Sequence, residues 1–293
     1  MEIVVPGSTP NPTPKQNTAG KKYAFLSGLP RSGSTLLGSL LNQNPEVHSG
    51  PNSPICGMMW HLEQSIIVSE PWTAYPKPDV LPGMVRGVLE AFYADTDCKL
   101  VVDKNREWAM PQNFELLQRN MPYEPRIIVT VRSIVEILAS FINLVHENEG
   151  RVSFIDKEIE AHKSAHFYKH PDEVRCSSLM RPQGPIDNAL YGVMFACQPE
   201  NKRFFHFVEY DSLVSNTEEV MNGIYDFLEI DRFEHDLSSI QNKFHENDAI
   251  YGLKGMHDVG RNISRSNVDI AKVLPQSVIF QYANMEFWRN RGI

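Results

Sequence analysis

One short segment near the N-terminus constrains the fold more than any other. Residues 25–45, FLSGLPRSGSTLLGSLLNQNP, begin apolar, pass through a loop containing Gly28 and Gly33, and continue into the helical pattern STLLGSLL. A strand, a glycine-containing turn and a helix in this order are typical of a phosphate-binding loop, because free N–H groups at the helix N-terminus attract an anion. An ordinary strand–turn–helix corner would not need Gly, Pro, Arg, Ser and Thr concentrated in one loop.

The loop lacks the lysine of the nucleoside triphosphatase pattern G-x-x-x-x-G-K-[ST]. Ser34 stands at the lysine position, Thr35 follows it, and Arg31 supplies a positive charge from inside the loop. Triphosphate hydrolysis also needs Mg²⁺ held by a strand-end aspartate. Asp103 could imitate that aspartate, but Lys104 follows it directly, and its ammonium group would compete with the metal. These residues favour a metal-free anion, such as a sulfuryl group, over a Mg²⁺-bound triphosphate.

Strand and helix patterns alternate along the rest of the chain. Short apolar runs predict strands at 23–28, 99–104, 126–132 and 203–210. Apolar residues at helical spacing predict helices at 34–44, 55–68, 79–93, 216–230 and 275–293. Such alternation is typical of an α/β protein, and we expect a three-layer P-loop fold whose central parallel sheet is flanked by helices on both faces.

Two segments depart from this alternation. Residues 1–20 become rich in Pro, Thr and Asn, and predict a flexible tail ahead of one P-loop domain at 21–293. Residues 146–185 are polar and hold few aliphatic side chains. This composition predicts an insertion over the edge of the sheet, or a lid over the substrate.

Composition and cysteine spacing narrow the class of protein. The 293 residues carry a net charge of −8, which argues against general nucleic-acid binding, since that relies on a basic surface. No signal peptide or membrane-spanning run is recognised. The cysteines form no C-x-x-C pair and no zinc spacing, so we expect reduced thiols in a cytoplasmic protein. They are Cys56, Cys98, Cys176 and Cys197.

Three basic residues follow predicted strands. Arg31 comes after the first strand, Lys104 ends the second, and Arg132 closes the run RIIVTVR. Ligands of parallel sheets bind beyond the carboxyl ends of the strands, so these cations are expected to converge on one edge. On the helix after Arg132, Ser140 lies on an otherwise apolar face, where it is either a small packing residue or a phosphate ligand.

Taken together, the motifs resemble those of the sulfotransferases that use 3′-phosphoadenosine 5′-phosphosulfate (PAPS). The resemblance spans residues 23 to about 290, in family order, through GLPRSGSTLL, LNQNPEV, VDKN, VRSIVEILAS, VEYDSLV and FLEI. The arginine-containing loop, PRSGSTLL, is similar to the carbohydrate and tyrosylprotein branches and to soluble bacterial or phage relatives. The resemblance implies metal-independent transfer of a sulfuryl group to a hydroxyl or amine of an acceptor that the motifs do not specify.

The resemblance also implies roles for residues of the loop and the second strand. The loop would hold the 5′-phosphosulfate through Arg31, Ser32, Gly33, Ser34 and Thr35. Lys104 resembles the lysine that neutralises charge between the phosphate and the departing sulfuryl group, and Arg31 would assist it.

Five further residues match positions near the nucleotide. Arg132 and Ser140 resemble the Arg-x7-Ser pair that binds the 3′-phosphate, and Tyr210 resembles a strand-end tyrosine beside the nucleotide. RNISRS, at 261–266, resembles a late basic loop that closes over the donor, with Arg265 and Ser266 as the best matches.

One departure leaves the general base open. The tyrosylprotein branch carries a glutamate after the first helix, whereas HSGPNSPI here places Pro51 and Asn52 where carboxylates would be. Neither side chain can accept a proton. We retain His48 as the candidate base, because imidazole has a suitable pKa. An acceptor acidic enough to need little help is an alternative.

Two other classes of protein remain as alternatives. A P-loop phosphotransferase or hydrolase would need Mg²⁺ and bind triphosphates. A nucleotide-binding relative without catalysis would bind adenosine 3′,5′-bisphosphate without turnover, and Asn52 is the main reason to consider it. A metal site at His162, His166 and His170 is set aside, because lysines lie among them and no carboxylate is placed to support them.

Overall fold

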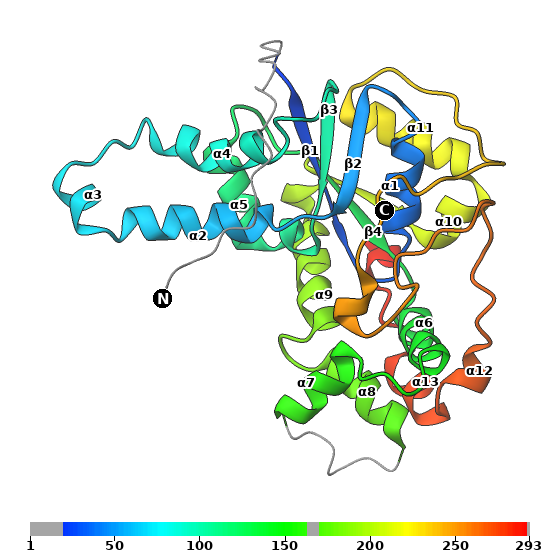
Figure 1. Ribbon diagram of the computed structural model, residues 1–293. Coiled ribbons are helices and arrows are strands. Elements are labelled where there is room, and N and C mark those ends of the chain that lie inside the picture. The colour runs from blue at the N-terminus through cyan, green and yellow to red at the C-terminus, as the bar shows by residue number, and fades with distance from the viewer. Residues whose placement is uncertain (1–19, 163–169, 292–293) are drawn as a thin grey trace, which may run out of the picture.

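A five-stranded parallel sheet forms the centre of the molecule. The computed structural model describes residues 20–162 and 170–291, so nearly all of the expected flexible tail lies outside the described residues. The strands run in the order β2-β3-β1-β4-β5 (Figure 1). Their bounds are Lys22–Gly28 for β1, Val47–Asn52 for β2, Leu100–Lys104 for β3, Ile127–Val131 for β4 and Phe205–Glu209 for β5. The sheet confirms the predicted α/β class.

Successive strand residues face opposite sides of the sheet, and each side is covered by helices. Leu26 and Val102 belong to one buried cluster, whereas Phe25 and Val101 belong to the other. The first side carries α1 (Ser34–Leu41), α10 (Tyr210–Ser215) and α11 (Thr217–Leu228). The second carries α2 (Ile55–Ile67), α4 (Leu81–Phe92), α5 (Pro111–Asn120), α6 (Ile134–Glu147) and α9 (Pro185–Ala196).

Two helical regions extend beyond the sheet. Helices α2 and α4 pack together as an arm with α3 (Glu70–Ala74) at its tip, on the left of Figure 1. A second layer packs on α6 and consists of α7 (Phe154–His162), α8 (Pro171–Met180), α12 (Ile270–Val273) and α13 (Gln276–Tyr282). The expected insertion at 146–185 therefore contributes helices to a packed layer, in which Ile155 and Leu179 are buried.

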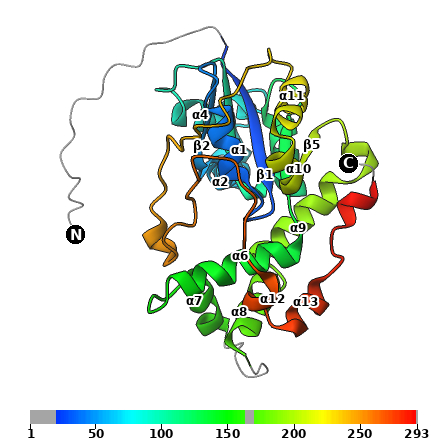
Figure 2. The same cartoon turned by 90° about the vertical axis from the view of Figure 1, so that its right-hand side faces the viewer.

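The sequence patterns missed strand β2 and several helices, among them α9 and α10. Residues 47–52 form β2 at the edge of the sheet although they contain Gly50 and Pro51, and proline is tolerated only on such edges. Helix α10 starts directly after β5, ahead of the predicted helix α11. The chain between α11 and α12 is mostly irregular and passes beside β2 and α1 (Figure 2).

Candidate active site

The loop between β1 and α1 depends on glycine at two positions. Gly28 has a φ of 120°, and a Cβ there would lie 2.1 Å from the carbonyl oxygen of Thr130 on β4. Gly33 has a φ of 91° directly before α1. Arg31 also adopts a positive φ, 57°, which is uncommon for a residue with a side chain. The loop therefore bends closely against β4 and presents the N-terminus of α1 at the carboxyl edge of the sheet.

Ser32 fixes the loop to the sheet. Its side chain is fully buried, its Oγ donates to the carbonyl of Leu29 at 2.5 Å, and it lies 2.7 Å from Oγ1 of Thr130. The hydroxyl is thus directed to the interior of the loop. The Ser32 side chain is therefore not free for the expected contact with a phosphosulfate, because its hydroxyl is hydrogen-bonded to Leu29 and Thr130.

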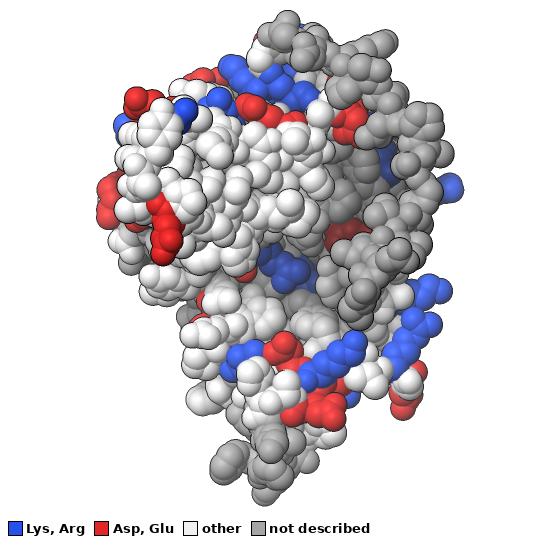
Figure 3. Space-filling view, turned by 60° about the vertical axis from the view of Figure 1, so that its left-hand side comes forward, with Lys and Arg blue, Asp and Glu red and all other residues white. Residues whose placement is uncertain are grey.

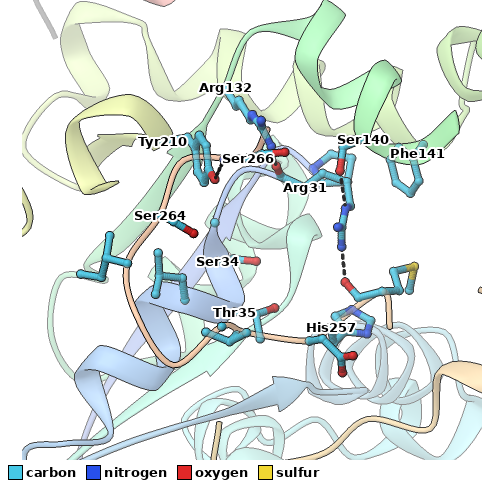
Figure 4. Close-up of a pocket in the computed structure, with 18 of the residues that line it drawn as sticks. Arg31, Ser34, Thr35, Arg132, Ser140, Phe141, Tyr210, His257, Ser264 and Ser266 are labelled. Atoms are coloured by element: carbon cyan, nitrogen blue, oxygen red, sulfur yellow. Dashed lines mark hydrogen bonds between the residues drawn. The ribbon is translucent and has the colours of Figure 1, made fainter. Parts of the chain in front are cut away.

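A cavity of about 230 Å³ lies beside this loop. Its walls come from the loop, α6, the start of α10 and the segment 256–266 (Figure 4). The structure brings together most of the residues singled out from the sequence. Those lining the cavity are Arg31, Gly33, Ser34, Thr35, Arg132, Ser140, Tyr210 and Ser266.

Arg31 spans the cavity. Its Nε donates to Oγ of Ser140 at 3.1 Å, and its guanidinium also donates to the carbonyl of Met256 (Figure 4). Burial, followed by the positive charge of Arg132, lowers the pKa of Arg31 to about 10. Two guanidinium groups held close to each other repel, so an anion bound between them would be stabilised by both.

Arg132 is held by three contacts. Its Nε donates to Glu136 at 2.8 Å, it donates to the carbonyl of Arg31 at 3.1 Å, and it stacks 4.0 Å from the ring centre of Tyr210. Burial acts to raise the pKa of Glu136, but hydrogen bonds and charges from Arg132 and Arg265 outweigh it and leave the pKa below its ordinary value. The guanidinium of Arg132 is therefore oriented before any ligand arrives.

Arg265 and Ser266 occupy different positions. The backbone N–H of Ser266 donates to the hydroxyl of Tyr210 at 3.1 Å, which ties the segment 256–266 to the cavity. Arg265 is instead 58% exposed and pairs with Glu136 and Asp211, each at 3.0 Å. Among the residues that line the cavity, Arg265 is absent, so its expected nucleotide contact requires a rearrangement of its side chain.

Lys104 and Asp103 point to opposite sides of the sheet. Lys104 is buried beside Ser34 and Thr35, and its Nζ lies 3.2 Å from Glu246. Burial lowers the pKa of Lys104, and Glu246 opposes that shift. Asp103 accepts hydrogen bonds of 2.6 Å from Tyr93 and from Trp108, and burial raises its pKa. Asp103 is consequently a core residue and does not face the loop as a metal-binding aspartate would.

His48 does not lie at the cavity. It occupies the second position of β2, four residues before the strand ends, and its ring packs edgewise against Tyr93 and Phe244 at 5.5 and 4.9 Å. Burial lowers its pKa. The expectation that His48 is the general base is corrected by this placement, because only the carboxyl end of the strand reaches the site.

His257 lines the cavity instead, and no sequence motif marks it. Its Nδ1–H donates to Asp248 at 2.6 Å, and its backbone N–H donates to the other oxygen of that carboxylate at 3.0 Å. Its Nε2 lies 3.4 Å from Glu246, which also accepts from Asn52. Burial lowers the pKa of His257, so the ring is neutral at pH 7 and can accept a proton on Nε2.

The four cysteines form no disulfide bond. His162 lies 3.4 Å from Glu158, and Nδ1 of His170 accepts from the backbone of Asp172, while His166 lies outside the described residues. Within the described ranges, no helix combines the length and hydrophobicity needed to cross a bilayer.

Comparison with known proteins identifies the family of the chain. The model described as Sulfotransferase family matches residues 24–235. The solved sulfotransferase domain from the curacin biosynthetic pathway aligns over 89% of this chain and 97% of its own, with 16% identity and a TM-score of 0.50. The corresponding domain of the Synechococcus PCC 7002 olefin synthase aligns over 91% and 96%, with 16% identity and a TM-score of 0.46.

A sulfotransferase from Alicyclobacillus acidocaldarius aligns over 79% of this chain and 88% of its own, with 15% identity and a TM-score of 0.47. No curated protein sequence matches the chain. The family match covers the β1–α1 loop, the strand ends and Tyr210, whereas the segment 256–266, which also lines the cavity, lies beyond the matched residues. The chain belongs to the sulfotransferase family.

Proposed function

We propose that the protein transfers a sulfuryl group from PAPS to a hydroxyl or amine of an acceptor, without a metal ion. The observation that carries this proposal is the meeting of Arg31, Arg132 and Ser140 beside the N-terminus of α1. Two cations and a helix N-terminus in one cavity suit a ligand with two anionic groups. The bisphosphate of a 3′-phosphorylated nucleotide is such a ligand.

Each anionic group of the donor has candidate partners. Ser34, Thr35 and the start of α1 would take the 5′-phosphosulfate. Arg132 and Ser140 would take the 3′-phosphate. Tyr210, which stacks on Arg132, would keep that guanidinium oriented. Ser32 would act through the shape of the loop.

His257 is the group best placed to serve as the base. In the proposed step the acceptor oxygen or nitrogen forms a bond to sulfur, and the S–O bond to the nucleotide breaks. The acceptor proton passes to Nε2 of His257, while Asp248 holds Nδ1–H and stabilises the imidazolium. Adenosine 3′,5′-bisphosphate leaves with the electron pair of the broken bond.

Lys104 would stabilise the leaving group. Its Nζ lies beside the residues of the loop, on the same side of the sheet as Ser34. Charge builds on the bridging oxygen only as the S–O bond breaks, so a cation there favours the transition state over the ground state. Glu246 holds Lys104 in the structure and would have to yield part of that contact to the donor.

Labelled-sulfate transfer tests the proposal. The protein is incubated with ³⁵S-labelled PAPS in EDTA, together with a pool of phenols, alcohols, amines, sugars and tyrosine peptides. We expect a labelled product whose formation needs the protein and does not need Mg²⁺. Binding of adenosine 3′,5′-bisphosphate with no labelled product from any pool would instead support a nucleotide-binding protein without catalysis.

A further inference from the structure

A second cavity adjoins the first, and none of the contacts proposed for the donor uses it. It measures about 480 Å³ and lies among the start of α2, the chain after β3, the start of α9 and Tyr251. We propose that this cavity is the acceptor site and that it takes a small, uncharged molecule with an apolar body and a hydroxyl group. This inference rests on the proposed function.

The position of the second cavity suits an acceptor. Asn52 and Arg106 line both cavities, so the two spaces meet at these residues. An in-line displacement needs the acceptor on the opposite side of the sulfuryl group from the nucleotide. His257 lines the first cavity, and its ring centre lies 6.1 Å from that of Tyr251, which lines the second. The proposed base therefore stands near the junction of the two spaces.

The size of the second cavity favours a small molecule. Cavities of roughly 300–1,000 Å³ are typical of sites that enclose a small ligand. Figure 3 shows the molecule hollowed between its upper and lower parts, with basic side chains at the bottom of the hollow. A groove that holds a polymer would run along an open edge of the molecule. The walls of this cavity instead come from the start of α2, the chain after β3, the start of α9 and Tyr251.

The lining of the second cavity favours an uncharged ligand. Apolar groups come from Pro54, Met110, Pro185, Ala189 and the Tyr251 ring. Polar groups that can orient a hydroxyl come from the side-chain amides of Asn52 and Asn188, whereas the amide of Asn105 is hydrogen-bonded to the backbone of Ser53 and Glu107. The charged residues in the lining are Arg106 and Glu107, which are opposite in sign.

The positive charge of Arg106 does not require an anionic acceptor. Among the described residues no hydrogen bond or ion pair of its guanidinium is found, and its electrostatic neighbours are Tyr251, Glu246 and Glu107. Because it lines both cavities, the sulfuryl group in transfer would pass beside it and supply its counter-charge. Glu107 is then the charged side chain in the second cavity that is left without a counter-charge from the donor. A carboxylate there, in a protein of net charge −8, disfavours acidic peptides and uronic-acid sugars.

Gly57 offers a direct test of the second cavity. It is the third residue of α2 and lines this space, and a Cβ built there meets no atom within 4 Å. Gly57→Trp should therefore fill the cavity while the helix is preserved. Gly83 is a matched control, because it is the third residue of α4, also has open space around a built Cβ, and lies outside the lining of both cavities.

The experiment measures two quantities for the wild type, Gly57→Trp and Gly83→Trp. The first is the affinity for adenosine 3′,5′-bisphosphate by calorimetry. The second is ³⁵S transfer to a panel of 2-naphthol, other neutral phenols and aliphatic alcohols, an acidic tyrosine peptide and a uronic-acid oligosaccharide. We expect the wild type to transfer sulfate to the neutral members of the panel, and Gly57→Trp to show a kcat/KM lower by about tenfold or more. Gly83→Trp should transfer sulfate as the wild type does. The affinity for the bisphosphate should be the same in all three proteins.

Three results would overturn the inference. Transfer confined to the acidic peptide or the oligosaccharide contradicts the acceptor class, and so does bisphosphate binding with no transfer to any neutral member. Equal transfer by Gly57→Trp and the wild type contradicts the location. Loss of bisphosphate binding in the wild type is a different outcome, because it contradicts the proposed function and not the acceptor inference alone.

Discussion

At the scale of single residues, the binding role proposed for Arg132 is accompanied by contacts that hold its side chain in place. Its contacts with Glu136, the carbonyl of Arg31 and Tyr210 hold the guanidinium in place, and it lines the cavity. Arg132→Ala removes a buried, charge-assisted phosphate contact worth about 1.5–3 kcal/mol. We expect the affinity for adenosine 3′,5′-bisphosphate to fall by about ten- to a hundredfold.

Calorimetric titration checks this prediction against Arg126→Ala. Arg126 precedes the other end of β4 and pairs with Glu229, so its loss should leave the nucleotide affinity unchanged. Unchanged affinity in Arg132→Ala would remove Arg132 from the site.

Lys104 should act on turnover more than on binding. Lys104→Ala is expected to lower kcat by about 10²–10³, as is typical when one donor to a developing negative charge is lost. Bisphosphate affinity should change less, because the bridging oxygen carries that charge only in the transition state. Single-turnover rates with saturating PAPS measure the effect.

Lys99→Ala is the control for Lys104. Lys99 precedes β3 and pairs with Glu46 on the surface, with 78% of its side chain exposed. Bisphosphate binding verifies that Lys104→Ala is folded, since the change leaves the Glu246 carboxylate without its lysine. Wild-type turnover in the folded variant would refute the leaving-group role.

His257 predicts a specific dependence of rate on pH. Burial lowers the pKa of His257 below its ordinary value of 6.5, because it outweighs the raising effects of Asp248 and Glu246. The imidazole is therefore neutral at pH 7, and kcat/KM should fall only when the pH drops below about 6.5. Since Asp248 acts to raise this pKa, Asp248→Asn should shift the fall to still lower pH and also reduce the maximal rate.

The experiment compares kcat/KM of the wild type, His257→Gln and His206→Gln across pH 5–9. This range spans the ordinary histidine pKa of about 6.5. His206 is half-buried on β5, stacks on Phe227 and also has a pKa lowered by burial, but it lies outside the cavity lining. His257→Gln should lose most of its activity and the acid limb, whereas His206→Gln should keep both. An acid limb that survives in His257→Gln would exclude His257 as the base.

At the scale of elements, the β1–α1 loop depends on its contact with β4. Gly28→Ala would place a Cβ 2.1 Å from the carbonyl of Thr130 at a φ of 120°. We expect a loss of about 1–3 kcal/mol or more in the free energy of unfolding. Gly87→Ala, on α4 with open space around the built Cβ, should instead gain about 0.5–1 kcal/mol. Urea unfolding measures both, and equal stability of the two variants would contradict the close approach.

The sequence predicted the elements that have strong local patterns. Apolar runs predict β1, β3, β4 and β5, and the rule that ligands bind at strand carboxyl ends predicts that Arg31 and Arg132 lie close together, as the structure shows. Strand β2 was not predicted, because Gly50 and Pro51 weaken its strand pattern. It is a strand through its pairing with β3. Lys104 was expected near the loop, but its partner Glu246 is 142 residues away in the chain.

His257 could not be predicted for the same reason. It lies on irregular chain, where neither helical nor strand periodicity marks which side chains face inward. Its pairing with Asp248, and the approach of both to the cavity, follow from the path of the segment between α11 and α12. For His48, a suitable pKa and proximity in sequence to the first helix do not define its position, and its place near the start of β2 keeps it away from the site.

At the scale of the whole molecule, the candidate site joins segments that are far apart in the chain. The loop after β1, helix α6, the start of α10 and the segment 256–266 meet at one cavity, and both Arg31 and the Arg265–Glu136 pair link α6 to that last segment. A nucleotide bound there would contact all four, so it should stabilise the folded protein as a unit. The same arrangement keeps the second cavity open on the side of α2 and α9.

The cavity is proposed to bind a 3′-phosphorylated adenosine nucleotide without a metal. Calorimetry with adenosine 3′,5′-bisphosphate in EDTA, and with ATP and Mg²⁺, tests this proposal. We expect the bisphosphate to bind in EDTA with a dissociation constant of about 1 μM or tighter, or about −8 kcal/mol, and Mg²⁺-ATP to bind at least about tenfold more weakly. Tighter binding of Mg²⁺-ATP, or bisphosphate binding that requires Mg²⁺, would contradict it.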